Sequence, residues 1–247
     1  MLKYYSKGFF MLCALLFNIT FYLWTALVAT ICFPFLLFRN FGFWIAKQWA
    51  LSALKILKWT VGTTVKIEGN VPKTRVLILS KHQSAWETIF FNTVIYRPAF
   101  ILKKELTWIP LFGSYLKAAG MIALDRQGTI QTLKNMIKDS KKVIESGRSV
   151  ILFPEGTRSA PGSKHPYKKG AYLLYKNLNV PVVPVALNSG MFWPRRAINK
   201  HKGMITVKFL PPIAPGLSED KFMSLIEERI ETESLKLFNQ VEKLNKN

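Results

Sequence analysis

The sequence has few cysteines and few histidines, and both shortages exclude classes of protein. The two cysteines, Cys13 and Cys32, lie inside an apolar N-terminal segment. They provide no disulfide framework, which is consistent with a reducing compartment, and they lie far from the polar motifs, which argues against a cysteine nucleophile. The three histidines, His82, His165 and His201, have no metal-ligand spacing to one another or to cysteine. We therefore expect neither a metal site nor a disulfide-rich fold.

Three common catalytic and nucleotide-binding motifs are also absent. The chain contains no Walker A loop, no Gly-x-Gly-x-x-Gly dinucleotide motif and no Gly-x-Ser-x-Gly nucleophile elbow. These absences argue against phosphate binding by a P-loop, against a dinucleotide cofactor and against a serine nucleophile of the hydrolase type. No bound cofactor is expected.

Acidic residues are scarce: 14 stand against 35 lysines and arginines, the net charge is +21, and no acid occurs before Glu68. Such a basic chain suits nucleic acid or an anionic membrane surface as a partner. Residues 8–38 contain no charged side chain, and as a helix they would extend about 46 Å, more than the roughly 30 Å hydrocarbon core of a bilayer. The run is too long for a signal-peptide core, and no small-residue cleavage site stands out. The sequence therefore favours membrane lipid, and not nucleic acid, as the partner.

The segment after this run has the pattern of an amphipathic helix. Lysines share one side of a helical wheel over residues 41–61, and the opposite side is apolar, with Ile45, Trp49, Ala53, Ile56 and Leu57. Such a helix commonly lies on a membrane surface, and a second core helix is the alternative. We therefore expect membrane-anchoring helices over residues 1–61 and a separate domain over residues 62–247. Positive residues are more numerous after the apolar run than before it, which favours a cytoplasmic location for that domain.

From about residue 62 onward, short apolar runs alternate with helical patterns, which is typical of an α/β fold. Strands are expected near residues 64–68, 75–80, 99–103, 120–124, 149–153, 182–187 and 204–210. Helices are expected near residues 84–96, 105–118, 128–146, 170–178 and 219–244. In the last helix acids come first and lysines later, an order that suits the helix dipole and needs no functional explanation.

A polar string, Lys-His-Gln-Ser-Ala-Trp-Glu at residues 81–87, follows the buried run Val76–Leu79. His82 is suited to accept a proton near pH 7, and a carboxylate such as Glu87 can orient its ring. Five positions separate the two residues, so they cannot share a helix face; the pair requires His82 in a turn and a helix that begins near Ser84. The alternative is that Glu87 only caps that helix, as in a capping box.

A second polar string, Phe-Pro-Glu-Gly-Thr-Arg-Ser at residues 153–159, follows another buried run. Glycine lets the backbone approach an anion, and Arg158 can bind phosphate oxygens through two parallel hydrogen bonds. Lys103 and Arg126 each follow a further apolar run, so one anion pocket at the rim of the sheet would unite these basic residues. A surface turn with scattered charge is the alternative. Residues 159–169 form either a loop that covers bound substrate or a plain exposed loop.

Four motif blocks, ordered and spaced between about residues 75 and 190, resemble those of the glycerolipid acyltransferase family, specifically the 1-acylglycerol-3-phosphate acyltransferases. They are His-x4-Glu at 82–87, Leu-Lys-Lys-Glu-Leu through Leu-Asp-Arg at 102–126, Phe-Pro-Glu-Gly-Thr-Arg-Ser at 153–159, and Val-Pro-Val-Val-Pro-Val at 180–185. The resemblance implies a mixed, largely parallel sheet flanked by helices, with a two-helix membrane anchor at the N-terminus.

The resemblance also implies roles for individual residues. His82 would be the general base on the acceptor hydroxyl, with Glu87 in place of the family's usual aspartate. A second departure is Lys81, where family members commonly have asparagine. The glycerol-phosphate-binding block of the family is matched by Glu155, Gly156, Thr157 and Arg158. The basic residues of the second block are matched by Lys103 and Arg126.

The reaction implied by the resemblance transfers a fatty acyl group from a thioester to the sn-2 hydroxyl of lysophosphatidic acid and gives phosphatidic acid. The thioester would be carried by coenzyme A or by acyl carrier protein, and neither a cofactor nor a metal is needed. Another lysolipid acceptor is the alternative within the same chemistry. The alternative from another class is a non-catalytic membrane protein that binds anionic lipid or nucleic acid through its charge, although no RNA-binding aromatic signature supports nucleic acid.

Overall fold

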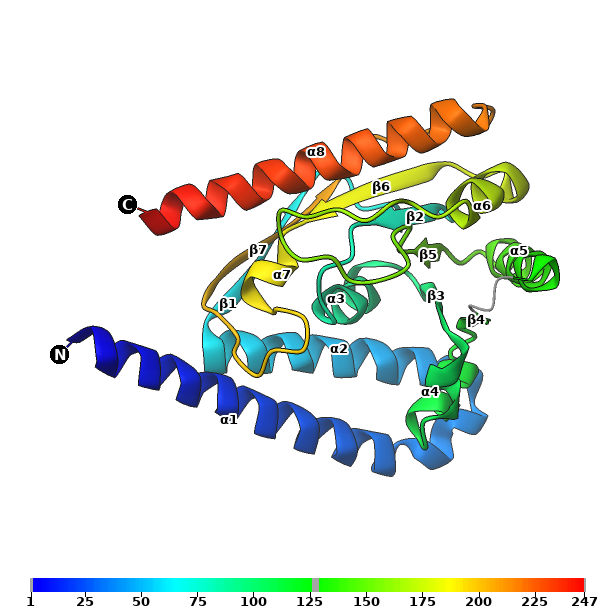
Figure 1. The fold of residues 1–247 in the computed structure, drawn as a ribbon. Coiled ribbons are helices and arrows are strands. Elements are labelled where there is room, and N and C mark those ends of the chain that lie inside the picture. The colour runs from blue at the N-terminus through cyan, green and yellow to red at the C-terminus, as the bar shows by residue number, and fades with distance from the viewer. Residues whose placement is uncertain (1, 126–128, 247) are drawn as a thin grey trace.

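The structure, a computed structural model, describes residues 2–125 and 129–246. Its centre is a seven-stranded sheet in the order β1-β7-β6-β2-β5-β3-β4 (Figure 1). Strands β2 to β6 run parallel to one another, whereas β7 is antiparallel to β6 and parallel to β1. This confirms the predicted mixed, largely parallel sheet, with strands at β1 (Thr63–Glu68), β2 (Leu77–Ser80), β3 (Ala99–Lys103), β4 (Ile122–Leu124), β5 (Val150–Leu152), β6 (Val182–Leu187) and β7 (Gly203–Phe209).

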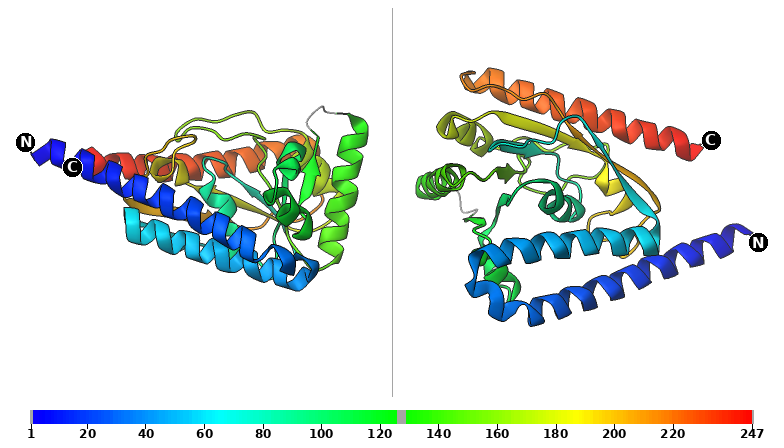
Figure 2. Two further views of the ribbon diagram at one scale, coloured as in Figure 1. Left: turned by 90° about the horizontal axis from the view of Figure 1, so that it is seen from below. Right: turned by 180° about the vertical axis from the view of Figure 1, so that it is seen from behind.

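Helices cover both faces of this sheet (Figures 1 and 2). Helices α2 and α3, with α1 outside them, pack on one face, and α5, α6 and α8 pack on the other. Successive residues of β2 point to opposite layers, since Ile78 joins the first cluster while Leu77 and Leu79 join the second. The helices are α1 (Leu2–Ile31), α2 (Arg39–Val61), α3 (Trp86–Val94), α4 (Phe112–Ala118), α5 (Ile130–Glu145), α6 (Gly170–Leu178), α7 (Ser189–Phe192) and α8 (Glu219–Lys246), with the 3-10 helices η1 (Phe33–Leu37) and η2 (Lys104–Trp108).

The arrangement of three central strands defines where the polar strings lie. β2 lies between β5 and β6, and Leu77 is in register with both Val150 and Val182. Because the three strands are parallel, their carboxyl ends meet at one edge of the sheet, where ligands commonly bind in α/β folds. The segments that begin at Lys81 and Phe153 both start at this edge, as the sequence predicted.

The apolar N-terminal run forms one long helix, α1, which lies alongside α2 (Figures 1 and 2). Pro34, the second residue of η1, cannot continue the α1 hydrogen-bond ladder, so α1 ends shortly before it. A narrow stripe of α1 that includes Phe17 is buried, but most of its large apolar side chains are exposed. Within the described residues, Gly8–Ile31 is the one helix long and apolar enough to cross a membrane.

The apolar side of α2 faces protein, which corrects the expectation that this side enters a membrane. Ala53 and Leu57 are buried in the core cluster shared with α3, and Lys47 is exposed on the other side. Trp44 and Trp59 also remain exposed. An amphipathic pattern shows that one side of a helix must be covered, but it does not distinguish lipid from protein as the cover. The two-helix membrane anchor is therefore not confirmed.

The expected single helix over residues 105–118 is wrong. The structure has η2 and α4 there, separated by a turn at Pro110 and Leu111. A proline forces the preceding residue into an extended conformation, and Leu111 has a positive φ of 60°, so no continuous helix passes through this point. The short α7 was not predicted, while the other expected helices are confirmed with ends shifted by a few residues.

Candidate active site

A histidine–carboxylate pair lies at the carboxyl end of β2. The Nδ1 atom of His82 is 2.9 Å from Oε1 of Glu87. Because a carboxylate only accepts hydrogen bonds, the proton of this contact lies on Nδ1, which leaves Nε2 able to accept a proton from a hydroxyl. Glu87 is fully buried and His82 is partly accessible, so the pair has the arrangement of a general base and its orienting group.

The Glu87 carboxylate is held by three further donors. Oε1 accepts the backbone N–H groups of Gln83 and Ser84, each at 2.7 Å, and Oε2 accepts the hydroxyl of Ser189 at 2.8 Å. The bond from the Ser84 N–H spans three residues, as in a capping box, but the N-cap of α3 is Ala85, one residue later. The carboxylate therefore ties down the turn that precedes α3 and contacts His82 at the same time.

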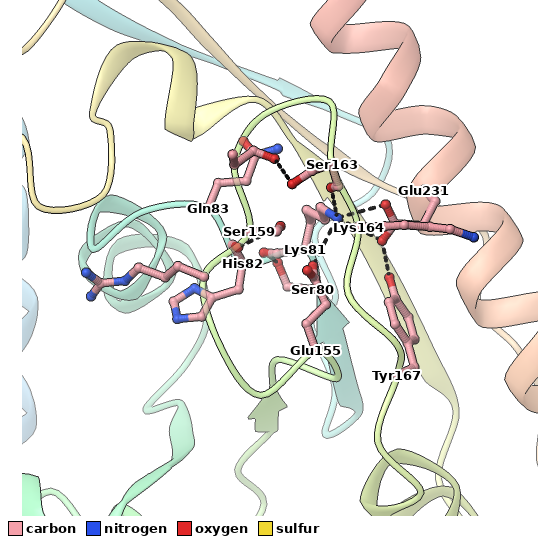
Figure 3. A network of polar contacts seen from close by, with 12 residues as sticks. Ser80, Lys81, His82, Gln83, Glu155, Ser159, Ser163, Lys164, Tyr167 and Glu231 are labelled. Carbon is pink, nitrogen blue, oxygen red and sulfur yellow. Dashed lines mark hydrogen bonds and ion pairs between the residues drawn. The ribbon is translucent and has the colours of Figure 1, made fainter.

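The segment after β5 closes over His82 from the other side. The Phe153 ring stacks on the imidazole with ring centroids 3.9 Å apart, and the N–H of Ser159 donates to the His82 carbonyl at 2.8 Å. The hydroxyl of Ser159 donates to the same carbonyl at 3.2 Å. The two polar strings recognised in the sequence are thus joined directly, and Figure 3 shows His82 and Ser159 side by side.

Arg158 lies in this closing segment, half-buried, within a group of three arginines. Arg195 donates from Nη1 to the Arg158 carbonyl at 3.2 Å. Burial lowers the pKa of Arg158 most, the Glu87 carboxylate acts in the opposite direction, and the charges of Arg195 and Arg196 lower it further. Positive charge gathered in this way suits an anionic ligand such as a phosphate.

The other predicted site residues have different surroundings. Glu155 is fully buried and ion-paired with Lys81. Gly156 has a φ of 70°, in the left-handed region that favours glycine, and turns the chain toward Arg158. Thr157 is half-buried beside it. Lys103 is exposed at the end of β3 and ion-paired with Glu105 at 2.9 Å, and Arg126 lies outside the described residues.

A second, buried polar network lies next to the pair of His82 and Glu87 and was not predicted from the sequence (Figure 3). The Nζ atom of Lys81 lies 2.7 Å from Oε2 of Glu231 on α8, 3.0 Å from Oε1 of Glu155, and 2.9 Å from the Ser163 carbonyl oxygen. Tyr167 donates to Oε1 of Glu231 at 2.9 Å. Burial and then the Glu231 charge raise the pKa of Tyr167, so its hydroxyl remains a donor. We call these residues the Lys81 network.

Two more unpredicted residues tie the end of β6 to the site. Besides the bond from Ser189 to Glu87, the N–H of Gly190 donates to Oε1 of Gln83 at 3.0 Å. The signal available in the sequence was their position directly after the buried strand β6, which is the same signal that marked His82 and Arg158.

A proton acceptor next to an anion-binding group fits a transferase that acts on a hydroxyl of an anionic substrate, and the comparisons agree with this class. The chain belongs to the acyltransferase family, whose family model matches residues 62–188. This confirms the family expected from the motif blocks, and the chain is an acyltransferase.

Individual proteins that the chain resembles have more specific names than the family. The chain is 34% identical over 180 residues to the 1-acyl-sn-glycerol-3-phosphate acyltransferase of Pseudomonas aeruginosa, a match that covers 72% of this chain and 70% of the relative. It is 29% identical over 224 residues to the human 1-acyl-sn-glycerol-3-phosphate acyltransferase alpha, with 88% and 78% covered. The fold resembles that of the 1-acyl-sn-glycerophosphate (LPA) acyltransferase PlsC from Thermotoga maritima, with a TM-score of 0.75, 24% identity, and 90% and 95% of the chains covered.

Proposed function

We propose that the protein transfers a fatty acyl group from a thioester to the sn-2 hydroxyl of 1-acylglycerol-3-phosphate and so forms phosphatidic acid. The observation that carries this proposal is the 2.9 Å contact between His82 Nδ1 and Glu87 Oε1, at the same edge of the sheet as Arg158. The names of the relatives from Pseudomonas aeruginosa and human supply the acceptor. The arginines around Arg158 support an acceptor that carries a phosphate.

In the proposed mechanism, the acceptor hydroxyl donates its proton to Nε2 of His82 as its oxygen attacks the thioester carbonyl carbon. The new carbon–oxygen bond forms, the carbon–sulfur bond breaks, and the departing thiolate takes the proton from the imidazolium. Glu87 keeps the ring oriented and stabilises the imidazolium while it carries the extra proton. General-base assistance of this kind contributes about 10²–10⁴-fold in rate.

Arg158 would bind the acceptor phosphate, because its guanidinium can form two parallel hydrogen bonds to phosphate oxygens. The turn at Gly156 and Thr157 brings the backbone close to the same place. That Lys103 and Arg126 also contact the phosphate stays a prediction. Glu155, predicted from the family motif to bind substrate, is fully buried and ion-paired, so we assign it a different part below.

The membrane location follows from the acceptor and from α1. A lysophospholipid resides in a bilayer, and α1 exposes a long apolar surface that would be unfavourable in water. We propose that α1 inserts into the membrane and that the catalytic domain lies on the cytoplasmic face, where acyl-coenzyme A or acyl carrier protein would deliver the acyl group.

The test is acyl transfer from a labelled acyl thioester to 1-acylglycerol-3-phosphate by the detergent-solubilised protein. We expect labelled phosphatidic acid from the wild type, a loss of about 10²–10⁴-fold in kcat for His82→Ala, and wild-type turnover for the control His165→Ala. Product at the wild-type rate from His82→Ala would remove His82 from the mechanism. Activity only on lysolipids without the phosphate monoester would replace the proposed acceptor, and no transfer at all, with liposome binding retained, would favour a non-catalytic lipid-binding protein.

A further inference from the structure

Lys81 is almost completely buried, although lysine is among the residues least often found inside a protein. Its side chain is 1% exposed, and that of Glu155 is 0% exposed. One cation therefore faces two carboxylates, Glu155 and Glu231, with Tyr167 as a further donor. Desolvating such groups costs free energy that the ion pairs only partly return, so this arrangement is better explained by the geometry it holds than by stability.

The Lys81 network joins three parts of the chain that are distant in sequence. Lys81 directly precedes His82, Glu155 and Ser163 belong to the loop after β5, and Glu231 lies on α8, 150 positions from Lys81. In Figure 3 the Lys81 amine lies among these groups, on the other side of the backbone from the His82 ring. Since consecutive residues of an extended chain point in opposite directions, Lys81 contacts α8 while His82 turns toward Glu87.

The loop that Lys81 holds is the same loop that carries Arg158. Phe153 stacks on His82 and Ser159 donates to the His82 carbonyl, so the position of this loop relative to His82 determines where Arg158 lies. Lys81 contacts the loop on either side of Arg158 and Ser159, at Glu155 and at Ser163. The contact with Glu231 ties the whole loop to the long helix α8.

We propose that Lys81 and Glu231 are positioning residues: their ion pair fixes the loop of residues 153–163 against His82 and so sets the distance between the base and the phosphate-binding Arg158. Glu155, which pairs with the same lysine, is part of this support. The role of Arg158 in this statement rests on the proposed function, whereas the fixing of the loop does not.

The test compares Glu231→Gln with a matched control, Glu227→Gln. Glu227 lies one turn earlier on α8 and pairs with Lys164 of the same loop at 3.0 Å, but this pair is exposed. Surface pairs of this kind have little effect, so the control should change each readout by less than about twofold. Glu231→Gln removes one charge-assisted hydrogen bond and should raise hydrogen exchange of the backbone amides in residues 156–165 about tenfold.

The kinetic readout is the KM for 1-acylglycerol-3-phosphate, measured well below the melting temperature of each variant. Glu231→Gln should raise this KM about tenfold while the KM for the acyl thioester stays within about twofold. Lys81→Met should raise it at least as much, and combining the two changes should add little, because both remove the same ion pair. A lower melting temperature with wild-type KM and wild-type exchange would show that the pair only stabilises the fold and would overturn the proposal.

The two proposals can fail separately. If the wild type makes no phosphatidic acid, the proposed function fails, and the exchange comparison between Glu231→Gln and Glu227→Gln still decides whether the pair fixes the loop. If Lys81→Met does not fold, Glu231→Gln provides both readouts, since it keeps the lysine paired with Glu155. Equal exchange in Glu231→Gln and Glu227→Gln would refute the fixing of the loop even in a fully active enzyme.

Discussion

Replacing Glu87 by glutamine tests whether the negative charge beside His82, and not only its shape, is used in turnover. The substitution keeps the length and the acceptor oxygen of the side chain. The amide oxygen can still accept the N–H groups of Gln83 and Ser84, and the hydroxyl of Ser189 can rotate to accept from the new NH₂ group. The variant should therefore fold with a melting temperature close to that of the wild type.

The magnitude follows from the contact between the two side chains. Nδ1 and Oε1 are 2.9 Å apart, and two unit charges centred about 4 Å apart attract by about 4 kcal/mol at an effective dielectric constant near 20. The amide retains a neutral hydrogen bond of about half the strength of the charged one. The transition state, in which His82 is cationic, should therefore lose about 2–4 kcal/mol, which corresponds to a fall in kcat of about 30- to 1,000-fold.

The assay is kcat for acyl transfer to 1-acylglycerol-3-phosphate with both substrates saturating, alongside the melting temperature. Glu87→Asp provides the comparison, since it keeps the charge but shortens the side chain by one methylene, about 1.5 Å. Because the charge dominates the estimate, Glu87→Asp should retain more activity than Glu87→Gln. A Glu87→Gln variant with more than about a third of the wild-type kcat, while His82→Ala is inactive, would refute this account of the pair.

Two further predictions concern residues with shifted pKa values. Arg158→Met should raise the KM for 1-acylglycerol-3-phosphate by about 10- to 100-fold and leave the KM for the acyl thioester unchanged, because it removes a charged phosphate contact; an equal rise in both KM values would contradict a contact with the acceptor phosphate. Burial lowers the pKa of Lys200 to about 8, whereas lysine in an unfolded chain has a pKa near about 10.4. Between these two values the unfolded chain binds more protons than the folded one, so the free energy of unfolding should rise with pH. Lys200→Met should lack this contribution, so the difference in melting temperature between the variant and the wild type should change between about pH 7 and about pH 10, and a constant difference would contradict the prediction.

The pairing of His82 with Glu87 could be predicted from the sequence because the relevant information is local. His82 and Glu87 are five positions apart, and the requirement that a turn precede the helix was confirmed, with α3 beginning at Trp86. Residues that follow buried parallel strands meet at one edge, which made the contact between the segment that carries Arg158 and the segment that carries His82 predictable. The pattern of apolar runs did not predict the order of the strands in the sheet, but it predicted that both polar strings would lie at one edge of the sheet.

Other features depend on long-range packing, which a one-dimensional pattern does not contain. The acids at the start of α8 fit its dipole, and nothing in their order distinguished Glu231, which meets Lys81, from exposed neighbours such as Glu228. The amphipathic pattern of α2 was recognised correctly, yet its cover proved to be α3 and the sheet and not lipid. The break between η2 and α4, in contrast, is a local feature, because a proline at position 110 cannot continue a helix.

The two neighbouring residues Lys81 and His82 connect the site to both layers of the fold. His82 is held through Glu87, which lies in the first turn of α3 on one face of the sheet, and Lys81 is held through Glu231, which lies on α8 on the other face. Both residues directly follow strand β2, so a change in either helix layer acts on the same short segment of backbone. The family match ends at residue 188, before α8, yet Glu231, which pairs with the residue beside His82, lies beyond it. Residues 62–188 therefore contain the groups proposed to react, and the C-terminal helix contains a residue that we propose positions them.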